Sequence, residues 1–374
     1  MREISVTKGA QLLVGGMVGA GIFGLPYAIA QAGFGIGLAE LIGLGAMHMI
    51  LFLALSDMIL NTPGTPRLSG VIEFYLGKHW SWIAGLLFFF SACGALLAYT
   101  ILGGTFAHAI FSSVLPASIT AYQYGFFAIA AFFLVGGIGI VSRMESWFVP
   151  FFFLMVCLIG IISLPFVQSK DLLSFYPEHA SIPFGVILFA MAGFGIVPEL
   201  SALLRSRRAT LRKSIVWGSL AVTTLYIVFA MIVMAVSDGH VSPDAFGGLA
   251  PMLGNGILVA GSTLGMLSVF SSFLLLGTEL INMLTFDYKK RFLVSWAGTV
   301  LIPFVAFLLG MRNFIEVIGW IGGVLGGGLG LILLAAYLAA KEHVCTPKRC
   351  LTIPNWVIYA CGAVYVVGIV VTIL

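Results

Sequence analysis

Two six-residue stretches decide the fold: Gly21-Ile22-Phe23-Gly24-Leu25-Pro26 and Gly193-Phe194-Gly195-Ile196-Val197-Pro198. In each, a glycine is followed five residues later by a proline, inside an apolar stretch that hydropathy would otherwise assign to one membrane helix. A broken helix in a bilayer leaves backbone N–H and C=O groups that only protein, water or a ligand can satisfy. Paired breaks in the two halves of a hydrophobic chain indicate the binding site of an inverted-repeat transporter.

The composition predicts an all-α, multi-pass membrane protein. The chain is 60% hydrophobic and only 9% charged, which is more apolar surface than one soluble core could hide. Windows of about 20 apolar residues predict eleven transmembrane helices, at residues 8–32, 34–60, 81–112, 122–141, 145–166, 183–204, 214–236, 255–285, 290–310, 314–339 and 353–374.

The basic residues predict the orientation of these helices. With a cytoplasmic N-terminus, every Lys and Arg except Lys170 and Arg312 falls in a cytoplasmic segment, as expected for a membrane protein. The net charge of +4 therefore reflects topology and contact with anionic lipid, and nucleic acid is not an expected partner. No obligatory protein partner is evident.

We expect one transmembrane domain, 1–374, built from two five-helix repeats at about 8–166 and 183–339 with an extra helix at about 353–374. Because five is odd, the repeats would be inverted relative to one another, which allows a central site to open alternately to each side. Residues 1–30 imitate a signal peptide, but cleavage is not expected because it would delete the first break.

Cys345 and Cys350 fall in a predicted cytoplasmic loop, where we expect ordinary thiols because disulfides are rare in that compartment.

The small residues at the two breaks predict a site for a zwitterion. In the first break, Gly19, Ala20, Gly21 and Gly24 would let an unwound backbone approach a ligand, and the following half-helix would favour a carboxylate. In the second, the unwound residues would expose carbonyls suited to an ammonium group; they are Ala192, Gly193 and Gly195. The alternative is that these glycines allow tight helix packing.

Four stretches carry a family resemblance: residues 15–26, residues 192–194 with Pro198-Glu199, residues 270–274, and residues 314–319 with Gly322-Gly323. Together they resemble the tryptophan/tyrosine permease family, within the amino acid/polyamine/organocation transporter superfamily. The resemblance covers nearly the whole chain. It implies a secondary active transporter of aromatic or other neutral amino acids in the bacterial inner membrane, working by ion-coupled symport and alternating access.

Three aromatic residues are candidates for contact with the substrate. The resemblance implies that the Tyr99 hydroxyl meets the substrate carboxylate. Phe23 and Phe194 lie at the two breaks and would line a pocket for the substrate side chain. Each of the three could instead be an ordinary packing residue.

The sequence leaves two candidates for the coupling ion, sodium and a proton, and no other cofactor is expected. Ser268, Ser271 and Ser272 share one helix face, at positions i, i+3 and i+4. The resemblance packs this face against the first break, where the carbonyls of Gly15 and Val18 would complete an all-oxygen sodium site. Serines in this pattern also join helices without any ion.

The alternative coupling ion is a proton. His48 lies near the middle of a predicted helix and carries an imidazole that titrates near neutral pH. A hydrogen-bonded structural role is the competing interpretation for this residue. For Glu199 and Glu279 we expect gating or structural pairing on the cytoplasmic side.

Other classes of protein fit the sequence less well. No nucleophile with a base, HExxH motif or phosphate-binding loop indicates an enzyme. No repeated pore loop or charged ring indicates a channel. The remaining alternative is an amino acid sensor that has the same fold but does not transport.

Overall fold

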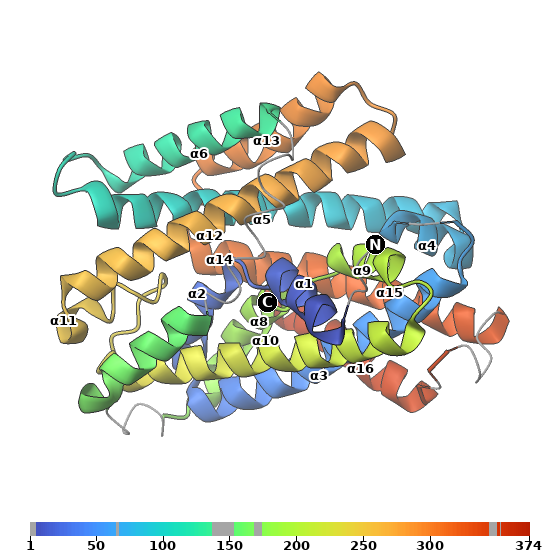
Figure 1. Cartoon of the computed structure of the whole chain (residues 1–374), viewed down its shortest axis with the longest axis horizontal. Helices are drawn as coiled ribbons and strands as arrows, with labels where there is room; N and C mark the ends of the chain where they lie inside the picture. Colours follow the sequence, from blue (N-terminus) through green and yellow to red (C-terminus); the bar gives the residue numbers. More distant parts are fainter. Residues whose placement is uncertain (1–4, 65–66, 137–152, 168–173, 344–349, 352) are drawn as a thin grey trace.

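A computed structural model describes residues 5–64, 67–136, 153–167, 174–343, 350–351 and 353–374. Within these ranges the chain is helical and has no strand (Figure 1). Six spans are long and apolar enough to cross a membrane: α3 (Phe34–Asn61), α5 (Lys78–Phe111), α10 (Arg208–Val236), α12 (Asn255–Asn282) with the π-helical turn η5 (Met283–Asp287), α14 (Phe314–Trp320) with the π-helical turn η6 (Ile321–Gly326) and α15 (Gly327–His343), and α16 (Asn355–Ile373).

The two predicted breaks separate pairs of shorter helices. α1 (Val6–Met17) and α2 (Gly21–Ala32) form a bent pair that adds a seventh candidate span. α8 (Ser181–Ala190) and α9 (Ile196–Leu203) form the second pair. The other short apolar helices are α6 (Ile119–Val135), Phe153–Phe166 and α13 (Phe292–Leu308).

Each of the eleven predicted segments therefore contains an apolar helix. Residues 137–152, which include the predicted end of 122–141 and the start of 145–166, lie outside the described residues. The count of eleven spans stays a prediction, as do the boundaries and the inverted relation of the two repeats.

Local sequence signals account for the helix ends. The Ser5 hydroxyl accepts from the N–H of Lys8 at the start of α1, and Ser118 and Asn313 cap α6 and α14 in the same way. Gly33, with φ +92°, is the single residue between α2 and α3. Only glycine adopts this conformation without strain, so it allows an abrupt change of direction. Three further short helices lie between these elements: α4 (Leu68–Leu76), η4 (Pro177–His179) and α11 (Ala250–Leu253). The helix Phe153–Phe166 ends in the 3-10 turn η2 (Leu164–Phe166).

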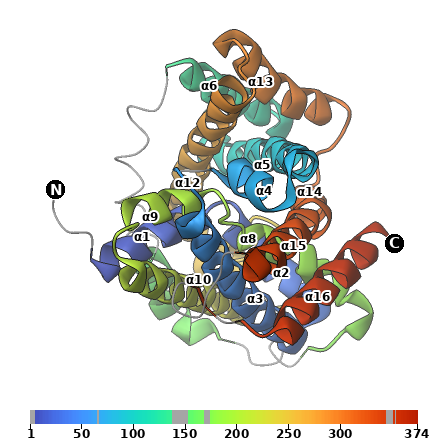
Figure 2. The same cartoon turned by 90° about the vertical axis from the view of Figure 1, so that its right-hand side faces the viewer.

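The broken spans lie inside the bundle. α2 packs against α8, and α1 packs against α10. Viewed along the bundle, α6 and α13 lie at one edge, α3, α10 and α16 lie at the opposite edge, and α1, α2 and α8 lie between them (Figure 2). Ala192 is exposed, but the other residues of the two interruptions are buried or half-buried, and non-helical backbone at membrane depth requires such surroundings of protein or water.

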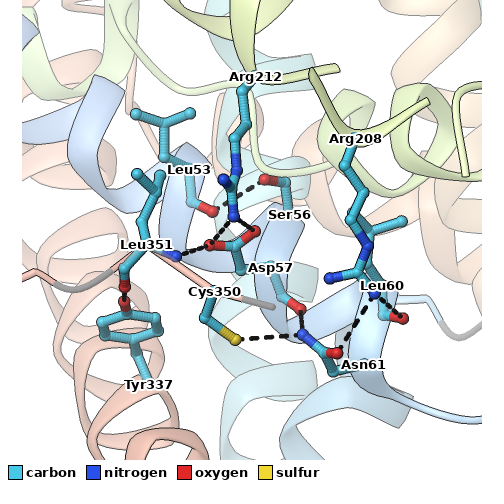
Figure 3. Close-up of polar contacts among 10 residues, drawn as sticks. All are labelled: Leu53, Ser56, Asp57, Leu60, Asn61, Arg208, Arg212, Tyr337, Cys350 and Leu351. Atoms are coloured by element: carbon cyan, nitrogen blue, oxygen red, sulfur yellow. Dashed lines mark hydrogen bonds and ion pairs between the residues drawn. The ribbon is translucent and has the colours of Figure 1, made fainter. Parts of the chain in front are cut away.

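One end of the bundle, here called the Asp57 end, is held by a buried ion pair. Asp57 is fully buried near the end of α3 and accepts from Arg212 Nη2 of α10, at 2.9 and 3.2 Å. It also accepts from the Leu351 backbone N–H at 2.7 Å, and Tyr337 of α15 donates to the Leu351 carbonyl at 2.6 Å (Figure 3). This network joins α3, α10, α15 and the segment before α16.

The cysteine at this end departs from the sequence prediction. Cys350 is disulfide-bonded, and its sulfur accepts from Asn61 Nδ2 at 3.2 Å (Figure 3). The prediction of an ordinary thiol at Cys350 is therefore wrong. It rested on the redox state of a compartment, which says nothing about the geometry of the loop. Cys93, Cys157 and Cys361 are free thiols, and Cys345 lies outside the described residues.

The opposite end, here called the Phe246 end, is closed by four phenylalanines. Phe23 of α2 lies 5.1 Å from Phe106 of α5, 6.4 Å from Phe229 of α10 and 5.6 Å from Phe246, measured between ring centroids. All four side chains are fully buried. Phe246 belongs to the loop between α10 and α11, so this loop contributes a side chain to the core of the bundle.

Candidate functional site

The first interruption lies at residues 18–20, where α1 and α2 are bent by 67°. Gly19 and Ala20 lie in this interruption, as predicted, whereas Gly21 and Gly24 are helical, so the unwound backbone is shorter than the sequence predicted. The physical reason is that Pro26, the sixth residue of α2, removes only one backbone hydrogen bond. Within a bundle, α2 continues through that loss.

The start of α2 leaves backbone donors available. Its N-cap, Ala20, makes no side-chain capping hydrogen bond. The N–H groups of Gly21 and Ile22 begin the helix, and the first N–H groups of any helix lack intrahelical acceptors. This positive helix end lies beside the break, where it favours an anion.

Two hydroxyls converge on the first break at Gly19. A Cβ placed on Gly19 would lie 3.4 Å from Ser272 Oγ of α12 and 3.6 Å from Tyr99 Oη of α5. These are ordinary contact distances, so the Gly19 backbone faces both hydroxyls closely. The structure thus brings together three of the predicted site residues from three separate spans.

Gly21 and Gly24 lie in tighter surroundings. A Cβ on Gly21 would come 2.6 Å from the Ala190 Cα at the end of α8, and one on Gly24 would come 2.7 Å from Ile318 Cδ1 of α14. No side chain fits at Gly21 without moving α8 backbone. The geometry at these two positions favours the packing role that was the alternative interpretation of the glycines.

The second interruption lies where the sequence predicts it, between Ala190 and Ile196. Pro198 is the third residue of α9, where helices tolerate the missing N–H. A Cβ on Gly193 would lie 2.9 Å from Met17 Cγ, at the end of α1. The two breaks therefore lie against each other. Ala192 is exposed at this position.

The two candidate pocket phenylalanines belong to different clusters. Phe23 lies in the cluster at the Phe246 end. Phe194 packs on α3 instead, with its ring 5.7 Å from Phe52 and 5.8 Å from His48. Phe194, a residue of the second break, therefore contacts rings of α3.

His48 is buried next to the second break. Its Nδ1 lies 3.1 Å from the Leu44 carbonyl, and because a carbonyl only accepts, Nδ1 carries the proton of this bond. Its ring also faces Tyr365 of α16, at 6.3 Å between centroids. The sequence prediction of a hydrogen-bonded, buried histidine is consistent with this geometry, and its role in coupling stays a prediction.

The predicted sodium ligands are positioned by α12 and the end of α1. Ser268 and Ser271 are buried, and the Ser271 hydroxyl donates to the Ser268 carbonyl at 2.9 Å. Val18 has extended backbone angles at the end of α1, so its carbonyl is not part of the helix, and Gly15 lies one turn earlier. In the described part of the chain, no group of three or more His, Cys, Asp or Glu side chains could hold a metal. The donor set on offer is hydroxyls and carbonyls, which fits sodium.

Sequence reasoning missed Tyr226, which touches both breaks. This residue of α10 is fully buried, and its hydroxyl lies 3.1 Å from the Met17 carbonyl and 3.0 Å from the Ala190 carbonyl. Met17 is the last residue of α1, and Ala190 is the last residue of α8. A single tyrosine in an apolar helix carries no signal of such contacts.

A cavity of about 150 Å³ opens at the Asp57 end. Its lining combines apolar side chains with charged residues around α9: Ile59, Leu60, Arg67, Pro198, Glu199, Ser201, Ala202 and Arg205. Pro198 and Glu199 follow the second break directly. The structure thus has space on the Asp57 side of the breaks and packed aromatic rings on the Phe246 side.

Comparison with known proteins identifies the family. Residues 2–374 match the tryptophan/tyrosine permease family. The chain belongs to this family. This permease is therefore a membrane transporter of amino acids and not an enzyme, as the sequence predicted. It is a multi-pass protein of the inner membrane.

Individual relatives cover nearly all of the permease. It is 26% identical to the tryptophan-specific transport protein of Shigella flexneri, over 92% of this chain and 89% of that protein. It is also 26% identical to tyrosine-specific transport system 1 of Haemophilus influenzae, over 84% of each. Identity to glutamine transporter 2 of Aliivibrio fischeri is 22%, over 91% of this chain and 89% of that one.

A solved structure supports the fold of the permease. The crystal structure of MhsT in complex with L-phenylalanine superposes with a TM-score of 0.70 and covers 98% of this chain and 97% of that one. The sequence identity is 15%, so the likeness concerns the fold. It agrees with the predicted all-α transporter fold with two broken helices.

Proposed function

We propose that this permease carries an aromatic amino acid across the inner membrane in symport with a cation. The observation that supports this most directly is the convergence of Tyr99 and Ser272 on Gly19, next to the uncapped start of α2. Two of the three relatives named above are specific for tryptophan and tyrosine. The glutamine transporter supplies the competing substrate.

The substrate carboxylate would bind at the first break. The N–H groups that begin α2 would donate to it, and Tyr99 would add its hydroxyl. The ammonium group would meet carbonyls of the second break, in residues 192–195. Because the breaks lie against each other through Gly193 and Met17, one zwitterion can contact both.

The coupling cation is sodium in this proposal. Ser271 and Ser272, with the carbonyls of Gly15 and Val18, offer hard oxygen ligands beside the carboxylate site. Ser272 would then lie close to both the bound ion and the bound substrate, because it is next to Gly19. Proton coupling through His48 is the alternative, supported by its position against Phe194 of the second break.

The Asp57 end would face the cytoplasm. This agrees with the basic residues around it, which include Arg67, Arg205, Arg208 and Arg212. The cavity beside Glu199 would then be the inner pathway, and the four phenylalanines would close the outer one. In alternating access, the two repeats would rock about the breaks and exchange these two arrangements.

Uptake into liposomes tests the proposal. The purified permease is reconstituted and given labelled tryptophan, tyrosine or glutamine under a sodium gradient or, separately, a pH gradient. We expect accumulation of an aromatic amino acid under the sodium gradient alone. Binding without accumulation would identify a sensor, and accumulation in sodium-free buffer driven by the pH gradient would refute sodium coupling and favour His48.

A further inference from the structure

The Tyr226 hydroxyl lies between two carbonyls whose helical hydrogen bonds the breaks remove. In a continuous helix, the Met17 carbonyl would accept from the N–H of residue 21 and the Ala190 carbonyl from that of residue 194. The backbone leaves the helical conformation after Met17 and again after Ala190, so both carbonyls lose their helical hydrogen-bond partners. The hydroxyl of Tyr226 lies within hydrogen-bond distance of each, at 3.1 and 3.0 Å.

The two carbonyls belong to one tightly packed junction. Gly21, the first residue of α2, lies so close to Ala190 that a Cβ on it would come 2.6 Å from the Ala190 Cα. Tyr226 reaches this junction from a third span, α10, and is 0% exposed. The Tyr226 hydroxyl and Gly21 thus hold three helix ends next to one another: the end of α1, the start of α2 and the end of α8.

We propose that Tyr226 is a positioning residue that ties the two broken spans together and thereby sets the geometry of the substrate site. The inference rests on the proposed function, in which the start of α2 binds the carboxylate and the second break binds the ammonium group. These two groups have a fixed separation in every amino acid. A substrate is bound well only if both breaks are held at the matching distance.

The chemistry of a hydroxyl suits a junction that must also move. Tyr226 has one proton, so it donates fully to one carbonyl at a time. When the broken spans shift relative to each other, the hydroxyl can rotate and donate to the Ala190 carbonyl instead of the Met17 carbonyl. Because an unpaired buried carbonyl is costly, a hydroxyl within reach of both carbonyls keeps a donor available to either one while the spans move.

The permease contains matched controls for this hydroxyl. Tyr337 is also fully buried and also donates to a backbone carbonyl, that of Leu351 at 2.6 Å, but it lies at the Asp57 end. Tyr365 is fully buried too, and its hydroxyl has no hydrogen-bond partner among the described residues. Replacing each by phenylalanine removes the same atom from a similar environment.

The experiment measures binding of labelled tryptophan, tyrosine and glutamine to the purified full-length protein, together with thermal melting. We expect Tyr226→Phe to raise the substrate Kd by at least about tenfold, which corresponds to ~1.4 kcal/mol. Tyr337→Phe and Tyr365→Phe should keep the Kd within about twofold of the unmodified protein. Tyr337→Phe also loses a buried hydrogen bond, so melting temperatures of the two variants separate general destabilisation from loss of affinity.

Each outcome has a definite meaning. If the unmodified protein binds none of the three amino acids, the proposed function fails and the inference fails with it. If the unmodified protein binds but Tyr226→Phe binds as tightly as Tyr337→Phe, the inference alone is overturned. If Tyr226→Phe cannot be purified folded, Gly21→Ala is measured instead, since its methyl group would force α2 away from Ala190. An unchanged Kd in that variant would also overturn the inference.

Discussion

The carboxylate of Glu279 lies against the backbone of Gly195, so closely that a Cβ on Gly195 would come 2.6 Å from Oε1. Gly195 is the N-cap of α9, and a negative charge is favourable at the start of a helix. The protein itself therefore places an acidic side chain at the second break. At the first break the neighbours of Gly19 are neutral hydroxyls, which supports the proposed binding of the substrate carboxylate at the start of α2.

Substrate affinity should depend on the space at Gly19. In Gly19→Ala the methyl group would enter the gap between Ser272 and Tyr99 without a clash, because the nearest atom is 3.4 Å away. We expect the protein to fold normally and the substrate Kd to rise about tenfold, or ~1.4 kcal/mol. The control is Gly43→Ala on α3, where a Cβ would meet nothing within 4 Å. Equal affinity in both variants would place the carboxylate elsewhere.

Sodium dependence should depend on the serines of α12. The double variant Ser271→Ala with Ser272→Ala removes two proposed ligands, so we expect a higher sodium concentration for half-maximal uptake and a smaller effect at saturating sodium. Ser262→Ala is the matched control, because Ser262 is a buried serine of the same helix. A sodium requirement that is the same in the double variant and the control would remove these serines from the ion site.

The aromatic cluster should control which side of the permease is open. Phe246→Ala removes the loop's ring from the packed cluster, which weakens outer closure and shifts the population toward the outward-open state. A cysteine at Ser201, which is buried and lines the inner cavity, reports this shift in a background without the five native cysteines. We expect it to react more slowly with a water-soluble thiol reagent in Phe246→Ala.

The comparison for this experiment is Phe111→Ala, because Phe111 is 46% exposed at the end of α5 and lies apart from the cluster. It should leave the reaction rate unchanged. If Phe246→Ala behaves like Phe111→Ala, the four rings are a packing cluster and do not form the outer gate.

Thermal stability should depend on the ion pair at the Asp57 end. Asp57→Ala removes the buried carboxylate that accepts from Arg212 and from the Leu351 N–H. Because Asp57 is fully buried and accepts both hydrogen bonds, we expect a clear fall in the melting temperature. Asp244→Ala, which removes an exposed acceptor of the Gly247 N–H, should melt close to the unmodified protein.

Hydropathy was enough to predict the helical architecture, and the glycine and proline stretches were enough to predict both interruptions, because these signals are local. They did not predict how short the first interruption is. Glycine favours both unwinding and close packing, and only the tertiary contact between Gly21 and Ala190 distinguishes the two. The position of Pro26 was misleading for a similar reason, since a helix in a bundle continues through one lost hydrogen bond.

Long-range contacts account for the remaining differences. Tyr226 reaches Met17 across 209 positions of the sequence, and nothing in its own helix indicates this. The contacts of Phe194 with Phe52 and His48 could not be predicted either, because 31 phenylalanines offer many alternative partners; its place in the substrate pocket stays a prediction. The bonding of Cys350 depends on loop geometry that composition does not encode.

The brevity of α8 and α9 has a consequence for how the protein is made. With ten and eight residues, they are about 15 and 12 Å long, and neither alone crosses a hydrocarbon layer of about 30 Å. On leaving the ribosome, this span would carry unpaired peptide groups into lipid. The hydroxyl that meets the Ala190 carbonyl is synthesised 36 residues later. Stable insertion of the second broken span must therefore wait for α10, so the order of translation is built into its assembly.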